Sequence, residues 1–387
     1  MFDFDEQINR LNTDSVKWNG IKMIYGTEDI LPMWVADMDF ASPYQIKEAL
    51  MKRVEHGIFG YGVPSSEINT VVKHWVKRRY KWDIKEEWLI PSSGVVTSIA
   101  FAIQALTEKG DKVLIQTPVY YPFYSMIENN GRKIVKNPLV LKNDKYEIDF
   151  NDFEDKLKSG VKLFILCSPH NPVGRVWTRK ELEKMGELCE RYGVYIVSDE
   201  IHADIIYEPN VHTPMASLNR YWENNSITCI APSKTFNIPG LQASVMIIPS
   251  SEIREKVRTV QGTIGFHGLN IFGNVAMEAA YKYGEEWLEA LLPYLQKNRD
   301  ALIQFIREEI PELNVVAPEG TYLVWIDCRK LGLSDDERKE RLIHRGKLGL
   351  EPGVKYGTEG AGFVRMNIGC TYKTLQDGLK RLKRAFT

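Results

Sequence analysis

The sequence predicts an α/β protein in which a mostly parallel central sheet is covered by helices and is followed by a smaller α+β domain. Between residues 88 and 248, short apolar runs alternate with helical stretches, which is the pattern of parallel strands joined by helices. Past about residue 285 the pattern changes to one long helix, two separated strands and a closing helix. We therefore expect a large domain over 46–285 and a small domain formed by an N-terminal arm, 1–45, together with 286–387.

Six short apolar runs are the expected strands of the large domain: 88–90, 113–115, 163–166, 194–197, 226–230 and 245–248. A helix is expected over 95–106. Another is expected over 179–191, because Thr178 is a good N-cap and Glu181 completes a capping box. Ligands of such sheets bind beyond the C-terminal ends of the strands, so a site is expected there.

The small domain shows fewer elements. A helix over 288–310 is expected to end at Pro311, because proline cannot continue a helix. Strands are expected at 322–326 and 362–368. The closing helix is indicated by an apolar stripe formed by Leu375, Leu379, Leu382 and Phe386.

The N-terminal residues are less regular. The apolar stretch 31–40 carries interleaved acids and is expected to form an extended arm on another surface. A helix is expected over 43–55, with Ser42 as N-cap and Pro43 in the first turn. Basic residues and aromatics occur together in 68–80, as in nucleic-acid-binding proteins, but the apolar residues share one helical face and favour an ordinary amphipathic helix.

The composition favours a globular protein that binds neither nucleic acid nor membranes. Of 387 residues, 44% are hydrophobic and 26% are charged, and the formal net charge is −1. No apolar run approaches the ~20 residues of a membrane helix, and the acidic N-terminus lacks the apolar core of a signal peptide. Five scattered cysteines lie mostly in apolar runs, which indicates buried thiols without disulfides or a metal-binding pair. A cytoplasmic location and no metal are therefore expected.

Lys234 lies just after the expected strand 226–230, in a turn rich in hydroxyls, proline and glycine. A lysine at such a position is partly desolvated, which favours the neutral amine. A neutral amine can form a Schiff base with a carbonyl compound. The alternative is an ordinary surface-loop lysine, and the other strand ends are needed to decide between the two.

Two other strand ends offer groups for a flat, phosphorylated ligand. Gly94 and Val95 open a helix directly after a strand, where free backbone N–H groups and the helix dipole favour a phosphate. An ordinary N-cap turn has the same composition. Tyr120 follows the next strand, placed either to stack on a flat ring or to pack in the core.

Three further polar residues follow the central strands. Asn171 lies in a dense turn, where its amide either donates to a ring oxygen or shapes the turn. Asp199 ends a strongly apolar strand, so its carboxylate needs a cation or hydrogen-bond donors, unless it caps the next helix. His202 follows, and a plain helix-start residue is its alternative role.

Together these residues suit pyridoxal phosphate. That cofactor needs a lysine for its aldehyde and an acid that keeps its pyridine nitrogen protonated. The chain offers both. At successive strand ends it also offers a helix N-terminus that can bind the phosphate, an aromatic ring that can stack on the cofactor, and an amide that can donate to the ring oxygen. The protonated ring is then the electron sink for a carbanion at the substrate Cα.

Six motifs spread over nearly the whole chain strengthen this interpretation: 32–40, 59–62, 168–174, 198–202, 233–237 and 364–367. With these motifs the chain resembles the fold-type I pyridoxal-phosphate enzymes of the aspartate-aminotransferase superfamily. Within them it is most similar to the MalY/PatB group of cystathionine β-lyases, or C–S lyases. The resemblance implies a large cofactor-binding domain and a smaller α+β domain.

The resemblance implies a role for the residues around the ring. Lys234 would carry the cofactor, and Asp199 would pair with its pyridine nitrogen. Asn171 would reach the ring hydroxyl oxygen, and Tyr120 would stack on the ring. His202 would also contact the cofactor.

The resemblance also implies the phosphate and partner contacts. The amides around Gly94 and Val95 would hold the phosphate, helped by Ser233. Tyr61 would reach the cofactor of the partner subunit, so the site implies a homodimer.

On the substrate side, the resemblance places Arg365 and Ala36. Arg365 would bind the substrate α-carboxylate through a bidentate ion pair. Without the family, Arg365 is equally well a surface residue at a strand edge.

The chain departs from the aminotransferase pattern at three positions. His202 stands where aminotransferases commonly carry tyrosine, a feature that the MalY-like group shares. Gln242 stands in place of a phosphate-binding arginine, and Ala231 stands where serine is frequent. Phosphate binding is therefore expected to depend on the helix N-terminus, Ser233 and Tyr61.

The expected activity is β-elimination from a small amino-acid substrate. Lys234 would remove the Cα proton, a thiolate would leave from Cβ, and pyruvate and ammonia would follow, so that L-cystathionine yields homocysteine. A class I/II aminotransferase shares the first steps and is one alternative. A MalY-like protein with a regulatory partner-binding role is another, although the sequence shows no nucleic-acid-binding motif.

Overall fold

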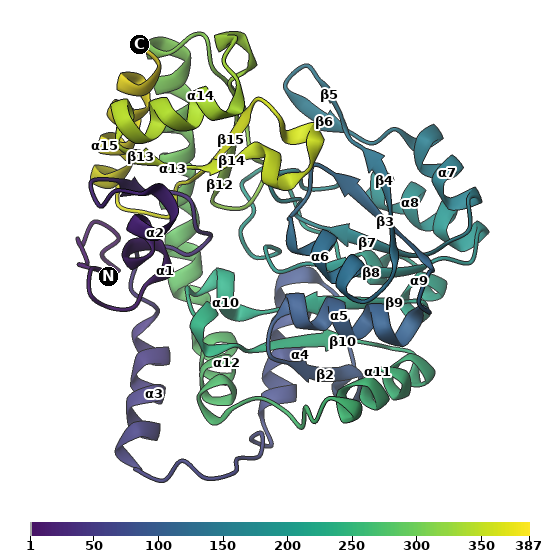
Figure 1. Ribbon diagram of the computed structural model, residues 1–387. Helices are drawn as coiled ribbons and strands as arrows, with labels where there is room; N and C mark the ends of the chain where they lie inside the picture. Colours follow the sequence, from purple (N-terminus) through teal and green to yellow (C-terminus); the bar gives the residue numbers. More distant parts are fainter. Residues whose placement is uncertain (1) are drawn as a thin grey trace.

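A seven-stranded sheet forms the centre of the larger part of the molecule (Figure 1). The computed structural model describes residues 2–387, so Met1, the first residue of the expected arm, lies outside the description. In order across the sheet, the strands are β2 (Leu89–Ser92), β10 (Ser244–Ile247), β9 (Ser226–Ile230), β8 (Tyr195–Asp199), β7 (Val161–Cys167), β3 (Lys112–Thr117) and β4 (Lys133–Pro138). β10 runs antiparallel to β2 and β9, and the other neighbours pair in parallel. The predicted mostly parallel sheet is confirmed.

Helices cover both faces of this sheet. The helices between residues 44 and 283 are α3 (Tyr44–Glu55), α4 (Ile68–Tyr80), α5 (Val95–Leu106), α6 (Pro122–Asn129), α7 (Phe150–Lys158), α8 (Arg179–Arg191), α9 (Arg220–Asn224), α10 (Pro232–Thr235), α11 (Ser251–Thr263) and α12 (Ile271–Tyr283). Of these, α3 packs on α12. In β7, Leu163 and Ile165 belong to the core formed with α5, α6 and α11. The alternate residues Phe164 and Leu166 belong to the core formed with α7 and α8. Strands that are apolar on both sides therefore explain the two helical layers.

A second, antiparallel sheet follows residue 285. Its strands are, in order, β11 (Asn314–Val316), β12 (Leu323–Asp327), β15 (Phe363–Asn367) and β14 (Glu351–Pro352), and its helices are α13 (Glu285–Glu309), α14 (Asp335–Glu340) and α15 (Tyr372–Phe386). A separate hairpin joins β5 (Val140–Lys142) to β6 (Lys145–Glu147).

The N-terminal segment lies beside this C-terminal part (Figure 1). After the short helices α1 (Val16–Asn19) and α2 (Ile21–Tyr25), β1 (Leu31–Pro32) pairs in parallel with β13 (Leu348–Gly349). The N-terminus is thus joined to residues more than 300 positions away, as the expected arm required. The domain boundaries near residues 45 and 285 remain a prediction.

Helix ends follow the sequence signals with one exception. The capping box of α8 is confirmed, since Thr178 and Glu181 bond reciprocally. The predicted N-cap of α3 is wrong. Pro43, with an extended ψ of 138°, separates Ser42 from the helix, which begins at Tyr44. The Ser42 hydroxyl instead donates to the backbone carbonyl of Asn237 at 3.3 Å.

Other differences have simple causes. The sequence pattern does not predict β4, because this edge strand carries lysines among its apolar residues and is largely exposed or half-buried. The apolar residues of α4 are buried together, which confirms the amphipathic interpretation of 68–80. None of the helices in residues 2–387 has both the length and the apolar character that a membrane span needs.

A buried carboxylate ties the turn after β9 to α4. Asp204 is 4% exposed and accepts a hydrogen bond from Thr235 Oγ1 at 2.7 Å. Tyr80 and Trp75 of α4 donate to the same carboxylate, at 2.5 and 3.2 Å. Burial raises the pKa of Asp204, and these donors oppose that rise. The cluster fixes α10, the single helical turn that carries Lys234.

Replacing Thr235 with valine keeps the side-chain shape but removes one donor to this carboxylate. Hydrogen bonds to charged groups contribute about 1.5–3 kcal/mol, so Thr235→Val is expected to lower the free energy of unfolding by about that amount. Urea denaturation followed by tryptophan fluorescence measures the loss. Thr259→Val, at an exposed site in α11, is the matched control and is expected to stay within about 0.5 kcal/mol of wild type. Equal changes in both variants would contradict the structural role of Asp204.

Candidate active site

A cavity of about 510 Å³ lies at the C-terminal ends of the parallel strands. Nine of the eleven predicted site residues line it: Ala36, Gly94, Val95, Tyr120, Asn171, Asp199, His202, Ser233 and Lys234. They come from five strand ends and, in the case of Ala36, from the N-terminal arm. The two others, Arg365 and Tyr61, are not among the lining residues.

The Lys234 amine is held by the N-terminal arm. Its Nζ donates to the Ala36 backbone carbonyl at 2.6 Å, and the Tyr322 hydroxyl donates to the same oxygen at 3.0 Å. Burial lowers the pKa of Lys234 to about 8, and the nearby Arg365 cation adds to this shift, while Asp37 and Asp199 oppose it. Near pH 8 about half of the amine is therefore neutral, whereas a free lysine side chain is almost fully protonated there. The surface-loop alternative for Lys234 is wrong.

Asp199 is a buried carboxylate with few interactions that offset the cost of burying its charge. It ends β8, is 4% exposed, and its Oδ1 accepts from the Ile201 amide at 3.1 Å. Across residues 2–387 its Oδ2 makes no hydrogen bond, and no cation lies within ion-pair distance. Burial raises the pKa of Asp199 to about 7, Glu200 adds to the rise, and the Lys234 cation opposes it. No helix follows Asp199 directly, so its alternative role as a helix N-cap is wrong.

Asn171 connects the cavity to Arg365. The Arg365 Nη1 donates to Asn171 Oδ1 at 3.0 Å, and its Nη2 donates to the Trp34 carbonyl at 2.8 Å. The guanidinium also lies over the Tyr356 ring, 5.1 Å from its centroid. At 3% exposure Arg365 is a buried residue of β15, so the surface alternative is wrong. Its Nε has no partner among residues 2–387.

The start of α5 presents unpaired backbone donors to the cavity. The helix begins at Val95, and the first amide with an intrahelical partner is that of Ser98, which donates to Gly94. The N–H groups of the first turn therefore remain for a ligand. Ser233 faces the same cavity and is 9% exposed. Gln242 also lines it, with a left-handed backbone (φ 52°).

The aromatic and imidazole rings differ in how tightly they are held. Tyr120 is half-buried beside Tyr121, with ring centroids 5.4 Å apart. His202 is 3% exposed and packs edge-on against Tyr322 at 6.0 Å. Burial, helped by the Lys234 and Arg365 cations, lowers the pKa of His202 to about 3, so its ring is neutral.

Tyr61 lies apart from the cavity. Its side chain is fully exposed, in the loop between α3 and α4. Within one chain it therefore contacts none of the residues that line the site. Its expected role requires a second subunit.

The comparisons with known proteins agree with this arrangement. The aminotransferase class I and II family matches residues 28–382. The chain belongs to that family. Cystathionine beta-lyase PatB from Bacillus subtilis is 49% identical, over 100% of both chains. Protein MalY from Escherichia coli is 36% identical, over 100% of this chain and 99% of its own.

Solved structures of class I and II relatives share the whole fold. Cystalysin from Treponema denticola, which contains a pyridoxal 5'-phosphate cofactor, has a TM-score of 0.96 at 36% identity, covering 100% of this chain and 98% of its own. The PLP-bound C-S lyase from Staphylococcus hominis has a TM-score of 0.92 at 33% identity, with the same coverage. The predicted fold class and the resemblance to the MalY/PatB group are confirmed.

Some groups at the site were not singled out by sequence reasoning. Tyr322 lies inside an apolar run, where nothing distinguishes it from a core residue. The carbonyls of Trp34 and Ala36 act through the backbone, which side-chain chemistry does not reveal. Within residues 2–387, no cluster of three or more histidine, cysteine or acidic side chains is arranged to hold a metal ion.

The Lys234 amine is expected to titrate near pH 8 in the protein without added cofactor. An amine-selective reagent should therefore label Lys234 half-maximally near that pH, below the ~10.4 of a free lysine side chain. Mass spectrometry of the Lys234 peptide measures the labelling rate at each pH. Asp199→Asn removes a nearby negative charge, which disfavours the protonated amine, so its midpoint is expected to fall further. A wild-type midpoint near that of free lysine would contradict the burial argument.

Proposed function

We propose that this chain is a pyridoxal-phosphate-dependent carbon–sulfur β-lyase. It cleaves L-cystathionine and related cysteine S-conjugates to a thiol, pyruvate and ammonia. One observation carries the proposal: a lysine amine with a lowered pKa and a buried carboxylate without a cation line the same cavity. The 49% identity to a cystathionine beta-lyase over the whole chain supports the choice of reaction.

The residues present fit the cofactor. Lys234 meets its aldehyde, and the unpartnered Asp199 Oδ2 is available to a protonated ring nitrogen. The first-turn amides of α5 and Ser233 are available to its phosphate, which compensates for Gln242 and Ala231. Asn171, whose Oδ1 is occupied by Arg365, keeps its amide NH₂ for the ring oxygen. Tyr120 and His202 complete the surface around the ring.

When bound, pyridoxal phosphate supplies an electron sink for the electron pair left at the substrate Cα. The chain supplies the rest. Lys234, partly neutral near pH 7–8, takes the Cα proton onto Nζ, and the Ala36 carbonyl orients that amine. Asp199 is ionised once it faces a cation, because an opposite charge lowers a carboxyl pKa. Loss of the thiolate from Cβ completes the elimination, and one water molecule then hydrolyses the unsaturated product to pyruvate and ammonia.

Arg365 binds the substrate α-carboxylate. It is buried, held in place by Asn171 and Trp34, and its Nε is free. The planar guanidinium therefore reaches a carboxylate without first ordering its own side chain. Ala36 lines the same cavity, and its carbonyl accepts the hydrogen bond from Lys234.

The second candidate is a class I/II aminotransferase, which the family match favours. Both reactions begin with proton removal by Lys234. They differ in where the proton returns. His202, one of the three positions at which the chain departs from the aminotransferase pattern, is a feature of the MalY-like group and favours the lyase.

The functional unit is a homodimer. The loop between α3 and α4 exposes an apolar set in one chain: Ile58, Phe59, Tyr61 and Val63. An exposed apolar set of this kind is typical of an interface. In the dimer Tyr61 reaches the cofactor of the other subunit. The five free, buried cysteines suit the reducing cytoplasm, where we place the protein.

Incubation of the purified protein with pyridoxal phosphate and L-cystathionine tests the lyase assignment. A free thiol, detected with a thiol reagent, and pyruvate are expected in equal amounts. Lys234→Ala is expected to lower the rate at least about 100-fold, since it removes the general base. Lys180→Ala, an exposed lysine of α8, is the control. Absence of thiol and pyruvate, with amino transfer to an added keto acid, would establish the aminotransferase instead.

Arg365→Lys tests the carboxylate contact. Lysine keeps the charge but loses the planar pair of donors, so KM is expected to rise about 10–100-fold while kcat changes less. Steady-state kinetics with L-cystathionine measures both constants. Arg329→Lys, at a largely exposed arginine of the same part of the chain, serves as the control. A fall in kcat at constant KM would contradict the assignment.

A further inference from the structure

The loop over residues 33–40 joins the two halves of the candidate site through its backbone. Its Ala36 carbonyl accepts from Lys234, and its Trp34 carbonyl accepts from Arg365. The Asn237 side chain bonds the amide and the carbonyl of Met38 at 2.9 and 2.8 Å. The loop itself has no helical or strand hydrogen bonding, so other contacts must fix its position.

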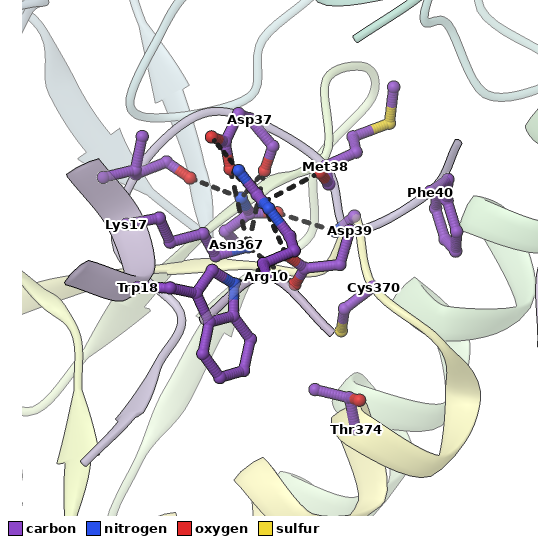
Figure 2. A network of polar contacts seen from close by, with 12 residues as sticks. Arg10, Lys17, Trp18, Asp37, Met38, Asp39, Phe40, Asn367, Cys370 and Thr374 are labelled. Carbon is purple, nitrogen blue, oxygen red and sulfur yellow. Dashed lines mark hydrogen bonds and ion pairs between the residues drawn. The ribbon is translucent and has the colours of Figure 1, made fainter. Parts of the chain in front are cut away.

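Some of these contacts come from the C-terminal part, where Asn367 Nδ2 donates to the Val35 and Asp37 carbonyls and the Gly369 carbonyl accepts from the Asp39 amide. The side-chain contacts to the two acids of the loop come from the N-terminal segment (Figure 2). Arg10 forms a bidentate pair with Asp37, at 2.9 and 2.8 Å, and donates to Asp39 at 2.6 Å. Lys17 donates to Asp39 Oδ2 at 2.7 Å, and the Trp18 indole donates to Asp39 Oδ1 at 3.0 Å. These two acids are the ones interleaved in the apolar 31–40 stretch.

The network is largely removed from water. Lys17 is 1% exposed and Asp39 is 9% exposed. Two cations face two carboxylates, so the network has no net charge, and burial of such groups contributes little to stability compared with apolar packing. Its Lys17 and Arg10 donors converge on the two residues that directly follow Ala36 and Met38. The geometry therefore favours a role in placing the loop.

We propose that Lys17 and Arg10 are positioning residues that hold the 33–40 loop so that its Ala36 carbonyl stays on the Lys234 amine. They are not among the residues that line the cavity, and they act through Asp37 and Asp39. The inference rests on the proposed function only for the catalytic use of Lys234. The inference goes beyond the proposed function because it assigns an effect on catalysis to two residues that lie outside the cavity.

The proposal predicts how the Lys234 amine responds when the network is broken. The charged or titratable groups that face this amine are Asp37, Asp199, His202, Arg365 and Tyr322, whose hydroxyl shares the Ala36 acceptor. With the loop in place, removal of the Lys17 cation would leave extra negative charge nearby and favour the protonated amine. Movement of the loop exposes the amine to water, and this relief of burial, the largest cause of its lowered pKa, opposes the loss of the Ala36 acceptor and of Asp37. The titration midpoint therefore does not report the loop, whereas the labelling rate of the fully neutral amine rises only when the loop uncovers it.

Lys17→Met is the test variant, and Arg10→Met, at a more exposed site, is the second in case the first does not fold. The rate of Lys234 labelling at a pH above the midpoint, where the amine is neutral in every variant, gives the first readout in the protein without cofactor. We expect this rate to rise above that of wild type in the test variants, because the Ala36 carbonyl no longer covers the amine. Lys17→Arg keeps the cation and should restore the wild-type rate. An unchanged or lowered rate in the test variants would overturn the proposal.

Activity of the cofactor-loaded enzyme gives the second readout. A displaced catalytic group costs up to about 100-fold, so kcat/KM for cystathionine is expected to fall at least about 10-fold in Lys17→Met. Arg338→Met removes an equally buried cation, paired with Asp335 in α14, and controls for lost stability. Lys22→Met breaks an exposed pair with Glu28 and controls for lost charge. Equal losses of kcat/KM in Lys17→Met and Arg338→Met would show that the network only stabilises the fold, and would overturn the proposal.

The two readouts separate this inference from the proposed function. If the chain had no lyase activity, the kinetic comparison would fail for wild type as well. The labelling rate of the neutral amine needs neither substrate nor cofactor and would still report the position of the loop.

Discussion

Burial of Lys234 and Asp199 in one cavity is the constraint on which the site depends. Each group is driven toward its neutral form, with pKa values near 8 and 7 in place of ordinary values of 10.5 and 3.8. In the chain without cofactor, the raised pKa of Asp199 makes stability fall as the pH rises from about 4 to 7. The lowered pKa of Lys234 costs its full amount of stability below about pH 8, and this cost disappears as the pH rises from about 8 to 10.5. A ligand with an aldehyde at one end and a cationic ring nitrogen at the other relieves both costs.

The sequence allowed much of this to be predicted, because strand ends and turn residues are local signals. The positions of Lys234, Asp199 and Asn171 followed from the apolar runs and from the turn residues that end them, since parallel strands bring their C-terminal ends together. The capping box of α8 was equally local. The Ser42 cap failed because Pro43 permits an extended geometry that composition alone does not reveal.

Contacts between segments that are far apart in the chain could not be predicted from the sequence. The acids in 31–40 were visible, but their partners, Arg10 and Lys17, lie in an irregular stretch without periodicity. The burial of Arg365 depends on the carbonyl of Trp34, more than 300 residues earlier in the chain. Such backbone acceptors carry no side-chain signature. The N-terminal arm therefore emerges as a part of the site only in the folded chain.

The most direct test of the account is a crystal structure of the protein grown with pyridoxal phosphate. Continuous electron density is expected between Lys234 Nζ and the cofactor, with the ring nitrogen within hydrogen-bond distance of Asp199 and the phosphate at the start of α5. A cofactor bound elsewhere, or a ring whose nitrogen faces away from Asp199, would contradict the account.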